Sequence, residues 1–133
     1  MGKVSTFLMF QGGQAEEAIN FYTSLIRDSA ISSISRYGKG ESGDEGTVMK
    51  AMFSLKGQEF MCIDSNVSHQ FNFTPSFSIY IDCDTEQEIR YLYENLAKDG
   101  QLLMPLDDYG FSQQFGWVQD RFGVSWQMDL PKE

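Results

Sequence analysis

The sequence predicts an α+β fold in which two βαβββ units form a curved mixed sheet around a groove, with the helices on the outside. Three observations support this prediction. One strand, one helix and three strands follow each other twice along the chain. The apolar stripes of the two helices correspond at Ile19 and Ile89, and the last hairpins turn at Gly57 and Gly123. The spacing between Ile19 and Ile89 is close to the spacing between Gly57 and Gly123. This indicates a duplicated unit, at about 3–65 and 75–131, within a single domain spanning 1–133.

The first unit begins with a strand that Gly12 and Gly13 end. Apolar residues at helical spacing follow, and three strands come next, the last two joined by a tight turn at Lys56 and Gly57. The glycine-rich loop 38–46 is either a mobile flap or, on the simpler interpretation, a long hairpin connection. The predicted elements are strands at 3–10, 30–37, 48–55 and 58–64 and a helix at 14–26.

The second unit follows a connector at 66–75. Thr85 and Glu88 form a capping box, in which the hydroxyl accepts from the Glu88 amide and the carboxylate reaches back. Gly100 is expected to end this helix as a left-handed cap. A turn at 120–123 joins the last two strands. The predicted elements are strands at 76–83, 101–104, 114–119 and 124–130 and a helix at 85–100, with a loop at 106–110.

Composition narrows the class of partner. The net charge is −9, which disfavours nucleic acid and anionic membranes, and 41% of the residues are hydrophobic, enough for a packed core. The N-terminal apolar run is too short for a signal peptide, and no segment is long enough to span a membrane. We therefore expect a cytoplasmic protein. Cys62 and Cys83 fall in apolar strand patterns and are expected to be buried free thiols.

Strand alternation assigns residues to the groove, provided that the helices cover the more apolar side of each sheet. Ile79 and Ile81 then face a helix, whereas their neighbours face the groove. Trp126 belongs to the core by the same argument, while Trp117 either lies over a flat ligand or fills a dimer interface. The resulting amphipathic pocket predicts a small-molecule ligand. Its predicted ligand-binding residues are Thr6, Leu8, Phe10, Met61, Ile63, Ser76, Ser78, Tyr80, Trp117 and Gln127.

Catalytic residues are less evident. The candidates for acid-base chemistry are Asp64, Tyr80 and the loop Asp107-Asp108-Tyr109, although adjacent carboxylates in a loop are usually a solvated turn. Neither cysteine has a histidine in register, and no Gly-x-Ser-x-Gly elbow occurs in the sequence. The single histidine, His69, lies in the connector and is interpreted as a surface residue.

Four stretches resemble a known family. They are FLMFQGGQAEEAINFYTSL, FTPSFSIYIDCDTEQEIRYLYENL, MPLDDYGFS and FGWVQDRFGVSWQ, and the last is the most specific. They are similar to the PhnB-like branch of the vicinal oxygen chelate superfamily, which includes glyoxalases, dioxygenases and bleomycin-resistance proteins. That branch often has the label 3-demethylubiquinone-9 3-methyltransferase. The resemblance implies the glyoxalase/bleomycin-resistance fold and agrees with the order of elements.

The resemblance also implies where a metal would bind. Metal-using members of the superfamily place their ligands at four inward positions, which correspond here to about Thr6, Met61, Ser76 or Ser78, and Gln127. Only Gln127 is a possible donor, so we expect no metal and no cofactor. The Gly12-Gly13 pair lacks the spacing of a nucleotide-type cofactor loop, so we do not expect the labelled methyltransferase activity.

Two functional hypotheses follow from these observations. The first is a metal-independent binding protein for a small, partly aromatic or apolar molecule. The alternative is an enzyme of glyoxalase, isomerase or dioxygenase type. A third possibility is a partner-binding subunit with a vestigial groove. The aromatic content and the exposed strand edges also predict a homodimer.

Overall fold

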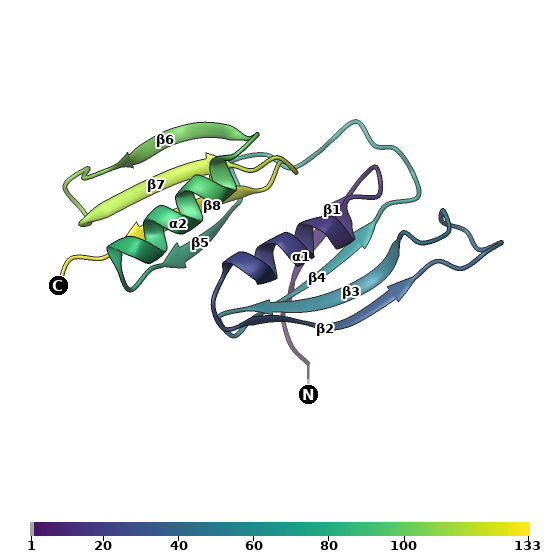
Figure 1. Ribbon diagram of the computed structural model, residues 1–133. Coiled ribbons are helices and arrows are strands. Elements are labelled where there is room, and N and C mark those ends of the chain that lie inside the picture. Colours follow the sequence, from purple (N-terminus) through teal and green to yellow (C-terminus); the bar gives the residue numbers. More distant parts are fainter. Residues whose placement is uncertain (1) are drawn as a thin grey trace. The chain divides into compact units, whose positions relative to one another are not determined.

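The computed structural model describes residues 2–133 and contains two compact units, one ending at His69 and the other beginning at Gln70 (Figure 1). Each unit consists of a strand, a helix and three further strands, and each has a four-stranded sheet of its own. This confirms the predicted α+β class and the repeated order of elements.

The first unit pairs its first and last strands in parallel at one edge of the sheet, and the other neighbouring strands are antiparallel. The sheet order is β1-β4-β3-β2. The hairpin between β3 and β4 turns at Lys56 and Gly57, which both have positive φ, as a two-residue turn of this kind requires. The elements of this unit are β1 (Thr6–Phe10), α1 (Ala15–Leu25), β2 (Ser29–Arg36), β3 (Val48–Leu55) and β4 (Gln58–Asp64).

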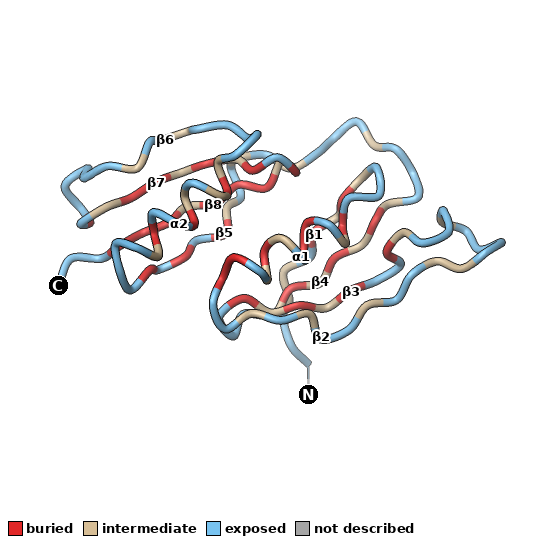
Figure 2. The backbone as a smooth tube through the Cα atoms, viewed as in Figure 1, coloured by how far each residue is buried: buried red, intermediate tan, exposed pale blue. Residues whose placement is uncertain are grey.

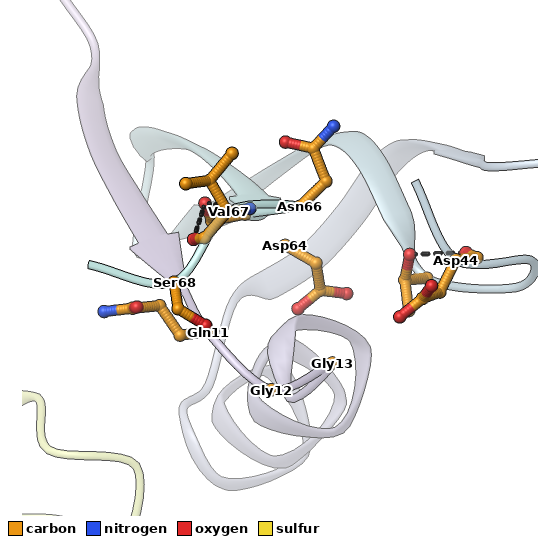
Figure 3. A pocket seen from close by; sticks show the side chains of 10 residues that line it. Gln11, Gly12, Gly13, Asp44, Asp64, Asn66, Val67 and Ser68 are labelled. Carbon is orange, nitrogen blue, oxygen red and sulfur yellow. Dashed lines mark hydrogen bonds between the residues drawn. The ribbon is translucent and has the colours of Figure 1, made fainter. Parts of the chain in front are cut away.

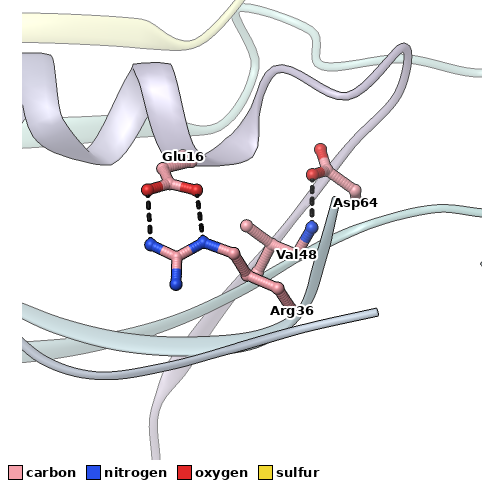
Figure 4. Close-up of polar contacts among 4 residues, drawn as sticks. All are labelled: Glu16, Arg36, Val48 and Asp64. Atoms are coloured by element: carbon pink, nitrogen blue, oxygen red, sulfur yellow. Dashed lines mark hydrogen bonds and ion pairs between the residues drawn. The ribbon is translucent and has the colours of Figure 1, made fainter. Parts of the chain in front are cut away.

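The start of α1 is fixed by a carboxylate at the end of strand β4. The residue before the helix, Gln14, makes no side-chain capping bond. Instead, Asp64 at the end of β4 accepts a hydrogen bond from the amide of Ala15 at 2.9 Å. Its second oxygen accepts from the amide of Val48 at 2.8 Å, and Figure 4 shows this second bond. Asp64 therefore supplies the helix cap and joins it to β3 and β4.

A surface ion pair also connects α1 to β2. Arg36 donates from Nε and Nη2 to the two carboxylate oxygens of Glu16, at 2.8 and 2.6 Å (Figure 4). The hydrogen bond to Arg36 lowers the pKa of Glu16. This forked geometry is the most specific arrangement that an arginine and a carboxylate can form.

The second unit repeats the design, with sheet order β5-β8-β7-β6 and a parallel pair between β5 and β8. Several of its bounds differ from the prediction by about one to three residues. β5 begins at Ser78 rather than residue 76, and β6 continues through Pro105, which an edge strand tolerates because one side of its backbone needs no partner. The elements are β5 (Ser78–Asp82), α2 (Glu86–Ala97), β6 (Gln101–Asp107), β7 (Gln114–Gln119) and β8 (Ser125–Leu130).

The two ends of α2 test the predicted capping box and the predicted left-handed cap. The amide of Glu88 donates to Thr85 Oγ1 at 3.0 Å, and the Glu88 carboxylate accepts from the amide of Asp84 at 2.8 Å. The predicted left-handed cap at Gly100 is wrong, because Asp99 has the positive φ of 59°. Gly100 is needed for space: a Cβ there would lie 2.2 Å from the carbonyl oxygen of Gln119.

A buried aspartate organises the hairpin between β7 and β8. The Asp120 carboxylate, 4% exposed, accepts from the amides of Phe122 and Val124 at 2.8 and 3.0 Å. It also accepts from the indole nitrogen of Trp126 at 2.8 Å. One side chain thus closes the turn and orients the largest fully buried residue of the protein.

Each unit has a core between its helix and one face of its sheet, where the buried segments of Figure 2 gather. In the first unit the rings of Phe53 and Phe60 stack at 5.2 Å. In the second, Trp126 and Met128 are fully buried. Cys62 and Cys83 are buried and free, as predicted.

We predict that Asp120→Ala lowers the free energy of unfolding by about 3 kcal/mol or more, because three donors lose a charged acceptor. Urea denaturation measures this loss. Asp120→Asn keeps one carbonyl oxygen as an acceptor and is expected to lose less. An alanine variant as stable as the wild type would show that this carboxylate does not hold the hairpin.

Candidate functional site

One face of the second sheet is left uncovered by α2. The opposite face lies against the helix, where a Cβ added at Gly116 would come within 2.9 Å of the Tyr93 ring. Because side chains alternate along a strand, Trp117 on β7 and Gln127 on β8 point away from the helix, and they are paired in the sheet register. Tyr80 on β5 pairs with Gln127 from the other side. We call this side the uncovered face.

A polar network joins the middle of the uncovered face. Its centre is the Ser125 hydroxyl, which accepts from the Trp117 indole at 2.8 Å and lies 2.7 Å from the Ser78 hydroxyl. The Gln127 amide donates to Ser78 Oγ at 3.2 Å. These four residues, from three strands, form a set of uncharged donors and acceptors that we call the polar network.

An aromatic cluster lies beside this network. Phe115 is 5% exposed and lies beneath three more exposed rings. The rings of Phe111 and Tyr109 meet it edge to face, at centroid distances of 5.2 and 6.3 Å, and Tyr80 is tilted against it at 6.4 Å. The Tyr109 hydroxyl donates to the carbonyl oxygen of Pro105 at 2.6 Å and so fixes its ring. These four residues are called the aromatic cluster.

Asp129 lies at the same end of the sheet. It pairs with Phe115 on one side and with Asp82 on the other, and by strand alternation it shares the uncovered face with Gln127. Its side chain is 8% exposed. Among residues 2–133, no hydrogen-bond partner reaches its Oδ1 atom. A buried carboxylate oxygen without a partner lowers the stability of the folded state, because the hydrogen bonds that it makes to water when unfolded are not replaced.

Asp129 changes the chemistry of the neighbouring tyrosine. The pKa of Tyr80 is raised from its ordinary value of 10.0 to about 12, first by desolvation and then by a hydrogen bond to Asp129 and the charges of Asp129 and Asp82. The negative carboxylate disfavours a second negative charge on the phenolate. Tyr80 is therefore a protonated hydrogen-bond donor at neutral pH.

The predicted grouping of site residues in the first unit is wrong. Leu8 and Phe10 are 4% and 1% exposed, and they pair with Cys62 and Asp64 on the face beneath α1. Thr6 pairs with Phe60 on that same face. Met61 and Ile63 lie on the opposite face and pair with Phe7 and Met9. The two apolar faces of β1 could not be distinguished by pattern, because both alternating sets are hydrophobic.

Other predicted residues lie apart from the uncovered face. Ser76 precedes β5, is exposed, and bonds to the Thr74 hydroxyl at 2.7 Å. His69 is half-buried beside Ser65, 3.2 Å from its hydroxyl. Asp107 ends β6, and Asp108 accepts from the amide of Gly110 at 2.8 Å, as a turn residue does. The structure brings Ser78, Tyr80, Trp117 and Gln127 together, and it adds Phe115, Ser125 and Asp129 to them.

A polar pocket of about 320 Å³ lies elsewhere, at the start of α1 (Figure 3). Its buried carboxylate, Asp64, already accepts backbone amides at both oxygens. Thr47 and Ser65 donate to the carbonyl oxygens of Asp44 and Val67 at 2.7 Å. Its groups are therefore used in joining loops. The lining residues are Gln11, Gly12, Gly13, Asp44, Thr47, Asp64, Ser65, Asn66, Val67 and Ser68.

Comparison with known proteins defines the class of this fold. A glyoxylase/bleomycin resistance protein/dioxygenase domain from Frankia sp. EAN1pec superposes with a TM-score of 0.66 over 99% of this chain and 98% of that chain, at 14% identity. The chain therefore has the glyoxalase/bleomycin-resistance fold.

A narrower family is also established. The family model described as 3-demethylubiquinone-9 3-methyltransferase matches residues 2–129, and the chain belongs to this family, the PhnB-like branch. A Bacillus cereus structure described as a putative 3-demethylubiquinone-9 3-methyltransferase, PhnB protein, is 58% identical over 97% of this chain and 99% of that chain, with a TM-score of 0.93. Protein YjdN of Escherichia coli is 25% identical over 98% of this chain and 96% of its own length.

The residues present do not fit the groups that the family and fold imply. Of the four positions that correspond to metal ligands, Thr6 and Met61 lie on opposite faces of the first sheet, and only Gln127 is a possible donor. Residues 2–133 contain no group of three or more His, Cys, Asp or Glu that could hold a metal ion. A methyl-donor cofactor of the nucleotide type needs a doubly wound parallel sheet, whereas each sheet here has a single parallel pair.

None of the helices within residues 2–133 is long and apolar enough to cross a membrane.

We predict that Asp129→Asn lowers the pKa of Tyr80 from about 12 toward 10.0, because the substitution removes the charge that disfavours the phenolate. NMR titration of ring-labelled tyrosine follows this ionisation. Asp99→Asn serves as the control, since it changes the net charge equally and asparagine tolerates the positive φ of Asp99. An unchanged Tyr80 titration in Asp129→Asn would show that the carboxylate does not act on the ring.

Proposed function

We propose that the protein binds a small organic molecule on the uncovered face of the second sheet. The supporting observation is that the polar network and the aromatic cluster lie next to each other on that face, joined by the Tyr80–Gln127 register pair. Aromatic rings supply flat apolar contact, and the amide and hydroxyl groups fix orientation. This combination suits a partly apolar molecule with one or two polar groups.

We propose that binding does not require a metal. The side chains of the polar network are two serines, a tryptophan and a glutamine, which are poor ligands for a divalent ion. Their hydrogen bonds to one another also hold them in fixed positions without an ion. We further propose a homodimer in the cytoplasm, a compartment that suits the two free buried thiols.

The alternative is an enzyme of glyoxalase, isomerase or dioxygenase type. One observation favours it: Tyr80 is a protonated phenol beside a buried carboxylate, and such a pair can give or take a proton. The methyltransferase activity in the family description is not proposed, because the topology does not provide the site for its cofactor.

Divalent ions distinguish the two candidates. If binding is metal-independent, adding Mn²⁺, Zn²⁺ or Mg²⁺ leaves the thermal midpoint unchanged, because an ion that binds only the native state would raise it. Differential scanning fluorimetry, with metal content measured on the purified protein, makes this test. A bound stoichiometric metal and a raised midpoint would favour the enzyme.

We predict that Gln127→Ala weakens the binding of small aromatic amides, such as benzamide, by about tenfold, because a hydrogen bond to the ligand is lost. Chemical shifts of the backbone amides of Ser78 and Gln127, followed by ¹⁵N NMR during titration, measure the affinity. Gln87→Ala is the matched control, since Gln87 is exposed on α2, on the other side of the sheet. Equal binding by both variants and the wild type would contradict the proposed site.

Trp126, next to Gln127 in the sequence, provides a test of which side chains lie on each face of the second sheet. Trp126→Ala is expected to cost about 3–5 kcal/mol of stability as a core deletion, whereas Gln127→Ala is expected to unfold at nearly the wild-type urea concentration. Equal losses of stability would contradict the assignment of these adjacent side chains to opposite faces.

A further inference from the structure

The aromatic cluster presents ring surface to solvent. Tyr80, Tyr109 and Phe111 are 53%, 39% and 58% exposed, although each touches another ring of the cluster. The rings of Tyr109 and Phe111 are within 15° of parallel, with centroids 6.2 Å apart. Ring faces have negative electrostatic potential, so exposed rings that converge on one place attract cations.

Asp129 adds a second, independent feature at the same place. Its carboxylate is more than nine-tenths buried, is paired in register with Phe115 of the cluster, and has one oxygen without a hydrogen-bond partner among residues 2–133. A buried carboxylate in this state is stabilised by a positive charge close to it. Tyr80 contacts the same carboxylate, which places ring and charge side by side.

The surrounding charges agree in sign. Asp82 and Asp107 end the neighbouring strands β5 and β6, in register with Asp129 and Phe115. The described strands β5 to β8 contain no lysine or arginine. Within the strands, the charges at this end of the sheet are therefore negative and favour cations, and the exposed Lys132 lies beyond the end of β8.

From these observations we infer that Asp129 and the aromatic cluster form a subsite for a small organic cation, such as an alkylated ammonium group. A neutral apolar ligand would cover the rings but leave the Asp129 oxygen without a partner. An anion would meet like charge. A cation interacts favourably with both the ring faces and the charge of the carboxylate. This inference rests on the proposed function, because the subsite occupies one end of the uncovered face.

The test compares choline with its neutral isostere, 3,3-dimethylbutan-1-ol, which has the same shape without the charge. Choline chloride is titrated into the ¹⁵N-labelled protein at constant ionic strength, with sodium chloride as the salt control. Saturable shifts are expected at the amides of Tyr80, Phe115 and Asp129. The alcohol is expected to bind about tenfold more weakly or worse.

Variants separate the two parts of the subsite. Asp129→Asn and Tyr80→Leu are each expected to weaken choline binding by about tenfold. Asp99→Asn, with the same change in net charge, is expected to bind like the wild type. Phe111 is exposed, so Phe111→Leu folds even if Asp129→Asn does not, and it is expected to weaken choline binding in the same way.

Three outcomes would overturn the inference: equal affinity for choline and the alcohol, undiminished choline binding by the substituted variants, or no saturable binding of choline. The benzamide titration shows separately whether the proposed function survives. If benzamide shifts the amides of Ser78 and Gln127 while choline binds nowhere, the face binds neutral molecules and only the cation subsite is refuted. If neither probe binds, both proposals are refuted.

Discussion

Each sheet in this protein has one helix to cover two faces. The first and last strands of each unit pair in parallel and so need a crossover connection, which in each unit contains the helix and two strands. The helix buries one set of alternating side chains, and the other set is left with no helix of its own unit over it. In the second unit that set is a connected group of polar and aromatic residues. The position of every candidate binding residue there depends on which side α2 occupies.

Three buried carboxylates differ in whether hydrogen bonds satisfy both of their oxygens. Asp64 and Asp120 each accept hydrogen bonds from groups of their own unit, and those bonds fix a helix start and a hairpin turn. Asp129 is comparably buried but keeps an oxygen without a partner in the described chain. In Asp64 and Asp120, both carboxylate oxygens accept hydrogen bonds from groups of the folded unit. The third keeps a hydrogen-bond acceptor without a partner among the described residues, and this is why we proposed it as part of the binding site.

Sequence patterns were sufficient for the repeat, the class of fold and most element positions, because strand alternation and helical spacing follow directly from burial. They placed Gln127 and Ser78 correctly relative to Ile79, since the polar and apolar sets on those strands differ clearly. They failed for Leu8, where both faces of the strand are apolar and the contact with α1 decides. They also missed Asp129, because the pattern does not show that one of its oxygens lacks a hydrogen-bond partner among the described residues. They missed Asp64 as the cap of α1, because Asp64 and the start of α1 are far apart in the sequence.

The distribution of the two cysteines provides a way to watch each unit open. Cys62 lies in the first unit and Cys83 in the second, and both are buried. Burial and the nearby charge of Asp64 raise the pKa of Cys62 to about 12, so its reactive thiolate is scarce while the unit is folded. Alkylation must therefore wait for local opening. The rates at which the two thiols are alkylated, resolved by mass spectrometry of the peptides, report how independently the duplicated halves unfold, with no substitution in the sequence.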